Sequence, residues 1–449
     1  MCQIPLETGC STCFKAEGWG SPFKSKPTRL LDPYRPHLRD EEVNMNRPEL
    51  LAPAGNLEKM KTAIHYGADA VYLGISGLSL RAKADNFSEM ELEEAFQYAH
   101  GRGVKCYATI NIFPHNRDLP LVRDHIRFLG YAQPDAVIVS DMGVFDLVKR
   151  EAPHLPIHIS TQTNITNVES AMFWERLGAR RLVLARELSI DEIARIREKV
   201  ELELECFVHG SVCISYSGRC YMSAFMVNRS ANTGECAHPC RWNYTLVEEK
   251  RPGEYFPVFE NDRGTFVMSS KDLCMIEHLD ELRQAGVNSF KIEGRTKGIN
   301  YVAGVVKAYR EAIDAFDPAG EYKVDDRWIA ELRALSNRGY TTGMYIEGQK
   351  ATDYNHDEEN AYRMNHTLMG IVLDRIEGKG KILMRNRLYP GDKVIFLTPG
   401  LEDRSFDVVS IEDENHSPLD STRNDEIVWI TVPEEVRIGD LVRKPLSKE

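Results

Sequence analysis

Four cysteines lie close together near the middle of the chain, where their side chains could share one ligand. Cys213, Cys220, Cys236 and Cys240 are separated by gaps of six, fifteen and three residues. Thiolate sulfur is the soft ligand that iron–sulfur clusters and zinc select, and four thiolates complete a coordination sphere without another residue type. The alternative is four small buried hydrophobic residues, but a polar, glycine-containing loop favours a metal or a cluster.

The identity of the fourth ligand stays open at the level of the sequence. Cys274 lies further along the chain and could replace Cys240, although it also belongs to an apolar pattern over residues 273–282 that is typical of an amphipathic helix. We therefore predict Cys240 as the ligand and Cys274 as a packing residue. Cys106 and Cys206 fall within strand patterns and are expected in the core.

The elements that must position these cysteines alternate between short apolar runs and longer amphipathic stretches. Such alternation predicts parallel strands covered by helices, and eight strands buried on both faces favour a closed (β/α)8 TIM-type barrel. An open doubly wound sheet is the alternative, but no GxGxxG motif follows the first strand. The predicted strands span residues 49–53, 69–75, 105–112, 135–140, 156–160, 181–185, 203–208 and 287–292, with helices at 56–66, 89–100, 168–177 and 190–199 among those between them.

Active sites of such barrels lie at the carboxyl ends of the strands. The cysteine segment begins just after the seventh predicted strand, so we expect it at this mouth, where His209 and Glu293 are candidates for an acid or base. His209 could equally be a structural histidine, and the arginines could form structural ion pairs. Polar residues at the predicted strand ends are Arg81, Asn111, Asp141, Gln162, Asn164, Arg186, Glu187, His209, Glu293 and Arg295.

The remaining sequence predicts four regions. Residues 1–44, which include an incidental CxxC pair, are predicted to be a flexible extension. Residues 45–316 are predicted to form the barrel, with a cysteine-rich insertion at 210–270. Residues 317–361 are predicted as a helical linker. Residues 362–449 change to a period of two, which predicts a small antiparallel β-barrel whose basic residues could contact RNA or simply form a solvated face.

Composition excludes several classes of protein. The net charge of -12 argues against a chain that coats nucleic acid non-specifically, although a local basic patch would be compatible with it. No apolar run is long enough to span a bilayer and no signal peptide is evident, so we expect a cytoplasmic protein with no membrane contact. Reduced cysteines in that compartment are typical of metal binding or catalysis.

Several motifs resemble one known family. The segment ECFVHGSVCISYSGRCYMS at residues 205–223 is similar to the signature of the collagenase-like peptidases, the thirty-second family of unassigned class. The segments ELLAPAGN at 49–56, GADAVYLG at 67–74, KIEGR at 291–295 and SNRGYTTG at 336–343 also resemble it. Within that family, GECAHPCRW at 234–242 together with a C-terminal β module is most similar to the prephenate-dependent tRNA uridine hydroxylases.

This resemblance implies oxygen-independent formation of 5-hydroxyuridine at the tRNA wobble position. It implies a 4Fe-4S cluster held by Cys213, Cys220, Cys236 and Cys240, prephenate as the hydroxyl donor, and tRNA as the partner. Prephenate carries two carboxylates, for which arginine is the preferred ligand. The substrate-binding candidates are Arg81, Gln162, Arg219, Arg295 and Tyr216, with Tyr221 and Trp242 as further aromatic residues that could stack on an unstacked base.

Two other functions remain open. A collagenase-like peptidase is one, but the chain has no HExxH and no GxSxG motif, and clustered cysteines are better explained as ligands than as one nucleophile beside His238. A non-catalytic RNA-binding maturation factor is the other. It would bind tRNA and leave the wobble uridine unchanged.

Overall fold

The computed structural model describes residues 47–76, 85–213, 215, 217–242, 260–261, 264–265, 271–317, 322–346, 364–400 and 402–446. The predicted extension over residues 1–44 and the candidates Arg81 and Tyr216 lie outside these ranges. Residues Met45–Glu449 form one compact unit. No helix within the described ranges is long and apolar enough to cross a membrane.

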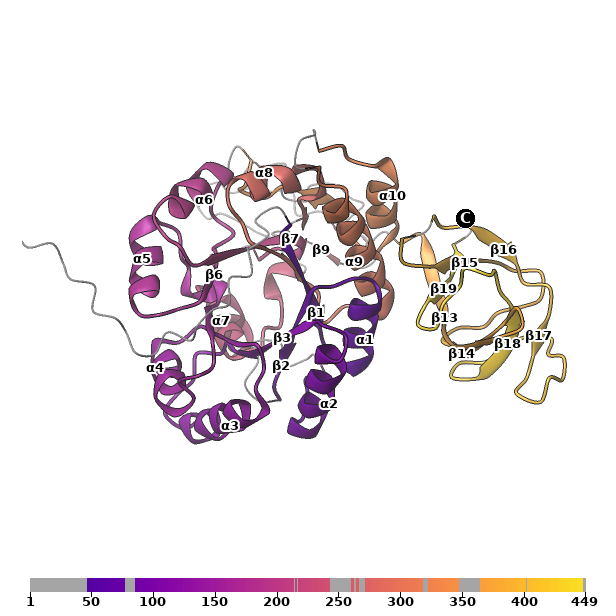
Figure 1. Ribbon diagram of the computed structural model, residues 1–449, viewed down its shortest axis with the longest axis horizontal. Coiled ribbons are helices and arrows are strands. Elements are labelled where there is room, and N and C mark those ends of the chain that lie inside the picture. The colour runs from indigo at the N-terminus through magenta and orange to yellow at the C-terminus, as the bar shows by residue number, and fades with distance from the viewer. Residues whose placement is uncertain are drawn as a thin grey trace, which may run out of the picture. The chain divides into compact units, whose positions relative to one another are not determined.

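Eight parallel strands close into a barrel, which confirms the predicted (β/α)8 architecture. Closure is made by the last strand, which pairs with the first at Ser289 and Glu49 and with the seventh at Lys291 and Phe207. Figure 1 shows the helices as a ring around these strands. The barrel strands are β1 (Glu49–Ala54), β2 (Ala70–Gly74), β3 (Lys105–Ile110), β4 (Ala136–Val139), β5 (Ile157–Ile159), β6 (Arg181–Val183), β7 (Glu203–Ser211) and β11 (Ser289–Ile292).

The helices begin where the sequence supplies capping residues. Ser88 and Ser189 each form a reciprocal capping box with the glutamate three residues on, which satisfies main-chain N–H groups that a helix start leaves unpaired. The helices of the barrel are α1 (Leu57–His65), α2 (Glu89–His100), α3 (Leu119–Ala132), α4 (Met142–Glu151), α5 (Val168–Arg176), α6 (Ile190–Arg197), α8 (Leu279–Gln284) and α9 (Ile299–Asp314), with a 3-10 turn η1 (Thr161–Thr163) after β5 and η4 (Ile276–His278) before α8.

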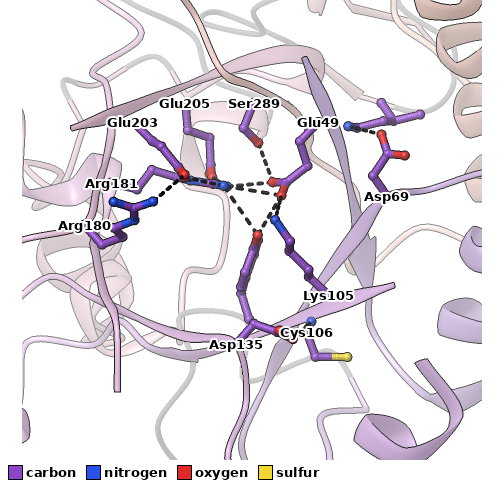
Figure 2. A network of polar contacts seen from close by, with 12 residues as sticks. Glu49, Asp69, Lys105, Cys106, Asp135, Arg180, Arg181, Glu203, Glu205 and Ser289 are labelled. Carbon is purple, nitrogen blue, oxygen red and sulfur yellow. Dashed lines mark hydrogen bonds and ion pairs between the residues drawn. The ribbon is translucent and has the colours of Figure 1, made fainter. Parts of the chain in front are cut away.

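The amino ends of the strands are joined by a buried ionic network inside the barrel (Figure 2). Arg181 at the start of β6 lies 2.6 Å from Glu49, 2.7 Å from Glu203 and 2.9 Å from Glu205. Lys291 of β11 lies 2.7 Å from the other oxygen of Glu205. These charges are paired and hydrogen-bonded, as burial requires. The end of a barrel opposite the active site serves stability, and this network closes it.

Two short strands extend the barrel sheet beside β7. The strand β10 (Asp272–Cys274) pairs with β7 in the antiparallel sense, Cys274 opposite His209, and β12 (Tyr340–Thr341) pairs with β10. The predicted helix starting at Cys274 was therefore wrong, since Cys274 ends a strand and the α-helix starts only at Leu279. Pairing with the long end of β7 outweighs the local helical pattern of the segment.

The C-terminal module is a curled antiparallel sheet in the order β16-β15-β19-β13-β14-β18-β17. It follows α10 (Asp326–Ala334), within the predicted helical linker. Its core contains alternating residues such as Ile382 and Met384, as the period of two predicts. Its strands are β13 (His366–Ile376), β14 (Lys379–Met384), β15 (Lys393–Leu397), β16 (Ser405–Asp407), β17 (Ile411–Glu412), β18 (Ile427–Thr431) and β19 (Leu441–Pro445).

Candidate functional site

The cysteine segment that leaves β7 lies against the carboxyl ends of neighbouring barrel strands. Glu187, after β6, accepts the main-chain N–H of Ser217 at 2.9 Å. Gly218, with a φ of 69°, packs so closely that a Cβ there would be 2.3 Å from the carbonyl oxygen of Gln162. The N–H of Phe113, after β3, donates to the carbonyl of Asn232 at 3.2 Å. The segment therefore lies at the mouth, as its position after the seventh strand predicted.

Three of the four predicted cysteine ligands are electrostatic neighbours. Cys213 is exposed as a residue, but desolvation of its thiol raises the pKa, and the nearby thiols of Cys220 and Cys236 raise it further. Cys240 lies in the 3-10 turn η3 (Pro239–Arg241), which packs against the short helix α7 (Met222–Val227) of the same segment. In the described part of the chain, no group of three or more His, Cys, Asp or Glu residues is close enough to hold a metal ion.

Cys274 lies in different surroundings. Its thiol is 3.8 Å from the hydroxyl of Tyr309, and burial raises its pKa to about 11. It packs against the hydrophobic core of the barrel. These contacts fit the packing role that the sequence suggested for it.

Arg186 stands between the barrel and the cysteine segment. Its guanidinium group lies over the ring of Phe207, 3.9 Å from the centroid, and donates to the carbonyl of Ser211 at 2.8 Å. Its positive charge acts on Cys213, where it opposes the rise in the pKa of the thiol. A fixed cation beside a thiolate favours the ionised form that binds metal.

A cavity of about 530 Å³ opens beside the mouth. It brings together two of the predicted substrate-binding residues, Gln162 after β5 and Arg219 of the cysteine segment. Ser140 and Ser160 both hydrogen-bond the side-chain amide of Gln162 and hold it in place. The lining also includes Phe113, Asp141, Met142, Thr163, Glu169, Ser170, Phe173, Trp174 and Arg176, so aromatic rings lie there among polar groups and charges of both signs.

The lumen below the mouth contains two further candidates, Glu293 and Arg295. Glu293 follows β11 and is 8% exposed, and its Oε2 lies 3.3 Å from the hydroxyl of Tyr72 of β2, which also donates to the carbonyl of Ile292 at 2.9 Å. Arg295 is 3% exposed and reaches Thr109 at 3.4 Å. Burial lowers the pKa of Lys291, which lies below them, although Glu205 opposes that shift. The buried carboxyl and guanidinium groups thus lie in one column inside the barrel.

His209 does not join this column. The pairing of β7 with β11 shifts after Phe207, so that His209 lies opposite Ile292 and turns outward. Its ring packs among Tyr301, Tyr309 and Tyr340 at centroid distances of 5.9, 5.3 and 5.4 Å. It is 1% exposed, and burial lowers its pKa to about 3. A neutral histidine in this layer is a structural residue, so Glu293 is the better placed of the two acid–base candidates.

Sequence reasoning missed Tyr72, Lys291 and Ser140, which complete the lumen and the mouth. Each lies within or directly after a predicted strand. A signal was present, because polar residues spaced by two in a buried strand point toward the lumen of a barrel.

The matches to known protein families cover most of the chain. Residues 55–355 match the model of peptidase family U32, and residues 364–443 match the model of the family U32 C-terminal domain. The chain belongs to peptidase family U32. The resemblance drawn from the motifs is thereby confirmed.

Relatives within family U32 carry two kinds of name. The chain is 37% identical to tRNA hydroxylation protein P1 of Bacillus subtilis, over 93% of this chain and 99% of that protein. It is 35% identical to tRNA hydroxylation protein P of Escherichia coli, over 90% and 100%. It is also 33% identical to a protein named Collagenase from Porphyromonas gingivalis, over 89% and 98%. The family alone therefore does not decide between RNA chemistry and proteolysis.

Proposed function

We propose that this protein is a tRNA hydroxylase that forms 5-hydroxyuridine at the wobble position, without molecular oxygen and with prephenate as the hydroxyl donor. The observation that carries the proposal is the cysteine segment lying across the barrel mouth, beside a cavity lined by aromatic rings and by Gln162 and Arg219. Full-length similarity to two proteins named for tRNA hydroxylation supports the same reading.

The four cysteines offer only thiolate ligands, and four thiolates are the usual donor set of a 4Fe-4S cluster. A cluster binds each thiolate through a different iron, so its ligands stand further apart than those of a single metal ion. Cys213, Cys220 and Cys236 would hold three irons and Cys240 the fourth. When bound, the cluster would supply electron transfer.

The protein's own residues would bind and orient the substrates. Arg219 in the cavity wall and Arg295 in the lumen supply guanidinium groups for the carboxylates of prephenate. The carboxylate of Glu293, whose Oε2 lies 3.3 Å from the Tyr72 hydroxyl, would act as the general base that accepts a proton from the substrate. A base must leave the stack to reach this depth, which fits a single-stranded anticodon loop.

The test is mass spectrometry of tRNA nucleosides. Cells that lack the gene, and any redundant pathway, should lose 5-hydroxyuridine, and the wild-type gene should restore it. In vitro, anaerobically purified protein with an intact cluster should hydroxylate tRNA only when prephenate is present. An unaltered 5-hydroxyuridine level in the deletion strain would refute the proposal.

Peptidase activity is the second candidate, because the Porphyromonas relative carries the name Collagenase. In this chain, His238 donates its main-chain N–H to the sulfur of Cys236 at 3.4 Å. A cysteine peptidase instead needs an imidazole nitrogen as the base. Incubation with denatured collagen separates the two functions, since a hydroxylase leaves it intact. Binding of tRNA without any modification would instead identify a maturation factor.

A further inference from the structure

The helix α7 of the cysteine segment carries aromatic side chains into solvent. Tyr221, at its N-cap, is 73% exposed and Phe225, one turn later, is 80% exposed. The N–H of Phe225 donates to the carbonyl of Tyr221 at 3.0 Å, so the two residues lie on the same side of one helical turn. Large exposed rings grouped in this way mark an interaction site.

Two arginines flank these rings. Arg219 precedes them and lines the cavity, and Arg229 follows the C-cap of the helix. Within the described ranges neither arginine forms an ion pair. Lys379 and Lys381 of the C-terminal sheet differ, because they pair with Glu412 and Glu414 at 2.6 and 2.8 Å. In a chain with a net charge of -12, unpaired guanidinium groups form a local site for an anion.

The surface is fixed in place by contacts within the cysteine segment and with the barrel. The hydroxyl of Ser223, on the buried side of α7, accepts the N–H of Ala237 at 3.0 Å. The turn that follows α7 is joined to the barrel through Asn232 and Phe113. A rigid platform loses little conformational entropy when a ligand stacks on it.

We propose that Arg219, Tyr221, Phe225 and Arg229, here called the α7 stripe, bind single-stranded RNA beside the mouth. Bases stack on the two rings and Arg229 contacts a phosphate group, as on other single-strand platforms, while Arg219 joins the stripe to the cavity wall. Because Arg219 belongs both to the stripe and to the cavity wall, RNA on the stripe places a neighbouring base at the cavity. The inference rests on the proposed function, since it assumes that the substrate is RNA.

The test is binding of a fluorescently labelled anticodon stem-loop RNA to the anaerobically purified full-length protein. Tyr221→Ala and Phe225→Ala should each weaken binding roughly 5- to 150-fold, the usual value of one stacked base. Arg229→Gln should lower the slope of log affinity against log salt by about 0.7. The matched control is Tyr131→Ala, because Tyr131 is 85% exposed near the C-terminal end of α3.

All variants must retain the visible absorbance of the wild type, which excludes a damaged cysteine segment. An affinity of the Tyr221→Ala, Phe225→Ala double variant within about twofold of the Tyr131→Ala control would overturn the proposal. Unchanged RNA binding with altered sedimentation of the protein would assign the α7 stripe to protein contact, and would also overturn it. Failure of the hydroxylase function is read separately, from the tRNA nucleosides made by the wild-type protein.

Discussion

Removal of Arg181 tests whether the ionic network at the amino end of the barrel stabilises the fold. Arg181→Met leaves Glu49 without its closest cation and removes one of the two cations that hold Glu205, whose side chain is completely buried. Breaking a buried pair from one side typically costs about 3–5 kcal/mol. Lys291 still pairs with Glu205, so we expect a loss of about 3 kcal/mol in the free energy of unfolding, measured by urea titration near neutral pH.

The neighbouring Arg180 supplies a matched control. Its side chain is 51% exposed and reaches Glu203 at 3.4 Å (Figure 2). Exposed pairs contribute about 0–1 kcal/mol, so Arg180→Met should change stability by no more than that. If the Arg181 and Arg180 variants lost equal amounts, the network would not be the stabilising element that its burial indicates.

The pH dependence gives the same experiment a second readout. Burial acts to raise the pKa of Glu49, but Arg181, Tyr107 and Lys105 outweigh it, so the pKa lies below its ordinary value. A lowered carboxyl pKa stabilises the wild type above about pH 4.3, and this contribution disappears as the pH falls. In Arg181→Met, Glu49 is still buried but has lost its main neighbouring positive charge, so protonation of its carboxylate removes a buried charge and stabilises the variant. The difference in the free energy of unfolding between the wild type and Arg181→Met should therefore become smaller from about pH 7 to about pH 4. A difference that does not change with pH would refute the role given to the Arg181–Glu49 pair.

Three further predictions concern the site. After anaerobic purification, Cys213→Ala should lack the broad iron–sulfur absorbance and Cys274→Ala should retain it. The reverse result would make Cys274, and not Cys213, a ligand of the cluster. Arg186→Gln should lower the midpoint potential of the proposed cluster in voltammetry, because a positive charge beside Cys213 is removed. An unchanged potential would show that the charge of Arg186 does not act on the cluster. The wild type should lose stability below about pH 6.5, because His209 binds a proton in the unfolded chain but, with a pKa of about 3, stays neutral in the folded protein. His209→Phe should reduce this loss. An equal loss of stability in the variant and the wild type would contradict the prediction.

The sequence predicted the barrel well because each strand is a buried run of mainly apolar residues and the segments between strands and helices contain capping or turn residues. The strand predicted over residues 105–112 is observed as Lys105–Ile110, and the one over 181–185 as Arg181–Val183. The cysteine segment was placed correctly for the same reason, since a loop after a parallel strand must leave from the carboxyl end of the barrel.

Side-chain direction could not be predicted in the same way. One extra residue in β7 turns His209 out of the lumen, and such a bulge depends on pairing with β11 rather than on local sequence. Cys274 was assigned to a helix because its own pattern is helical, while its strand exists only by contact with β7. The cavity beside Gln162 joins β4, α5 and the cysteine segment, so its shape follows from tertiary packing alone.

The closed amino end of the barrel affects the order in which substrates can bind at the other end. With Arg181, Glu205 and Lys291 filling that end, the described part of the barrel leaves the mouth as the route to Glu293. Under the proposed function, RNA bound at the same opening would cover it. The proposed small substrate would then enter first and its product leave last, which predicts a compulsory order of addition in steady-state kinetics.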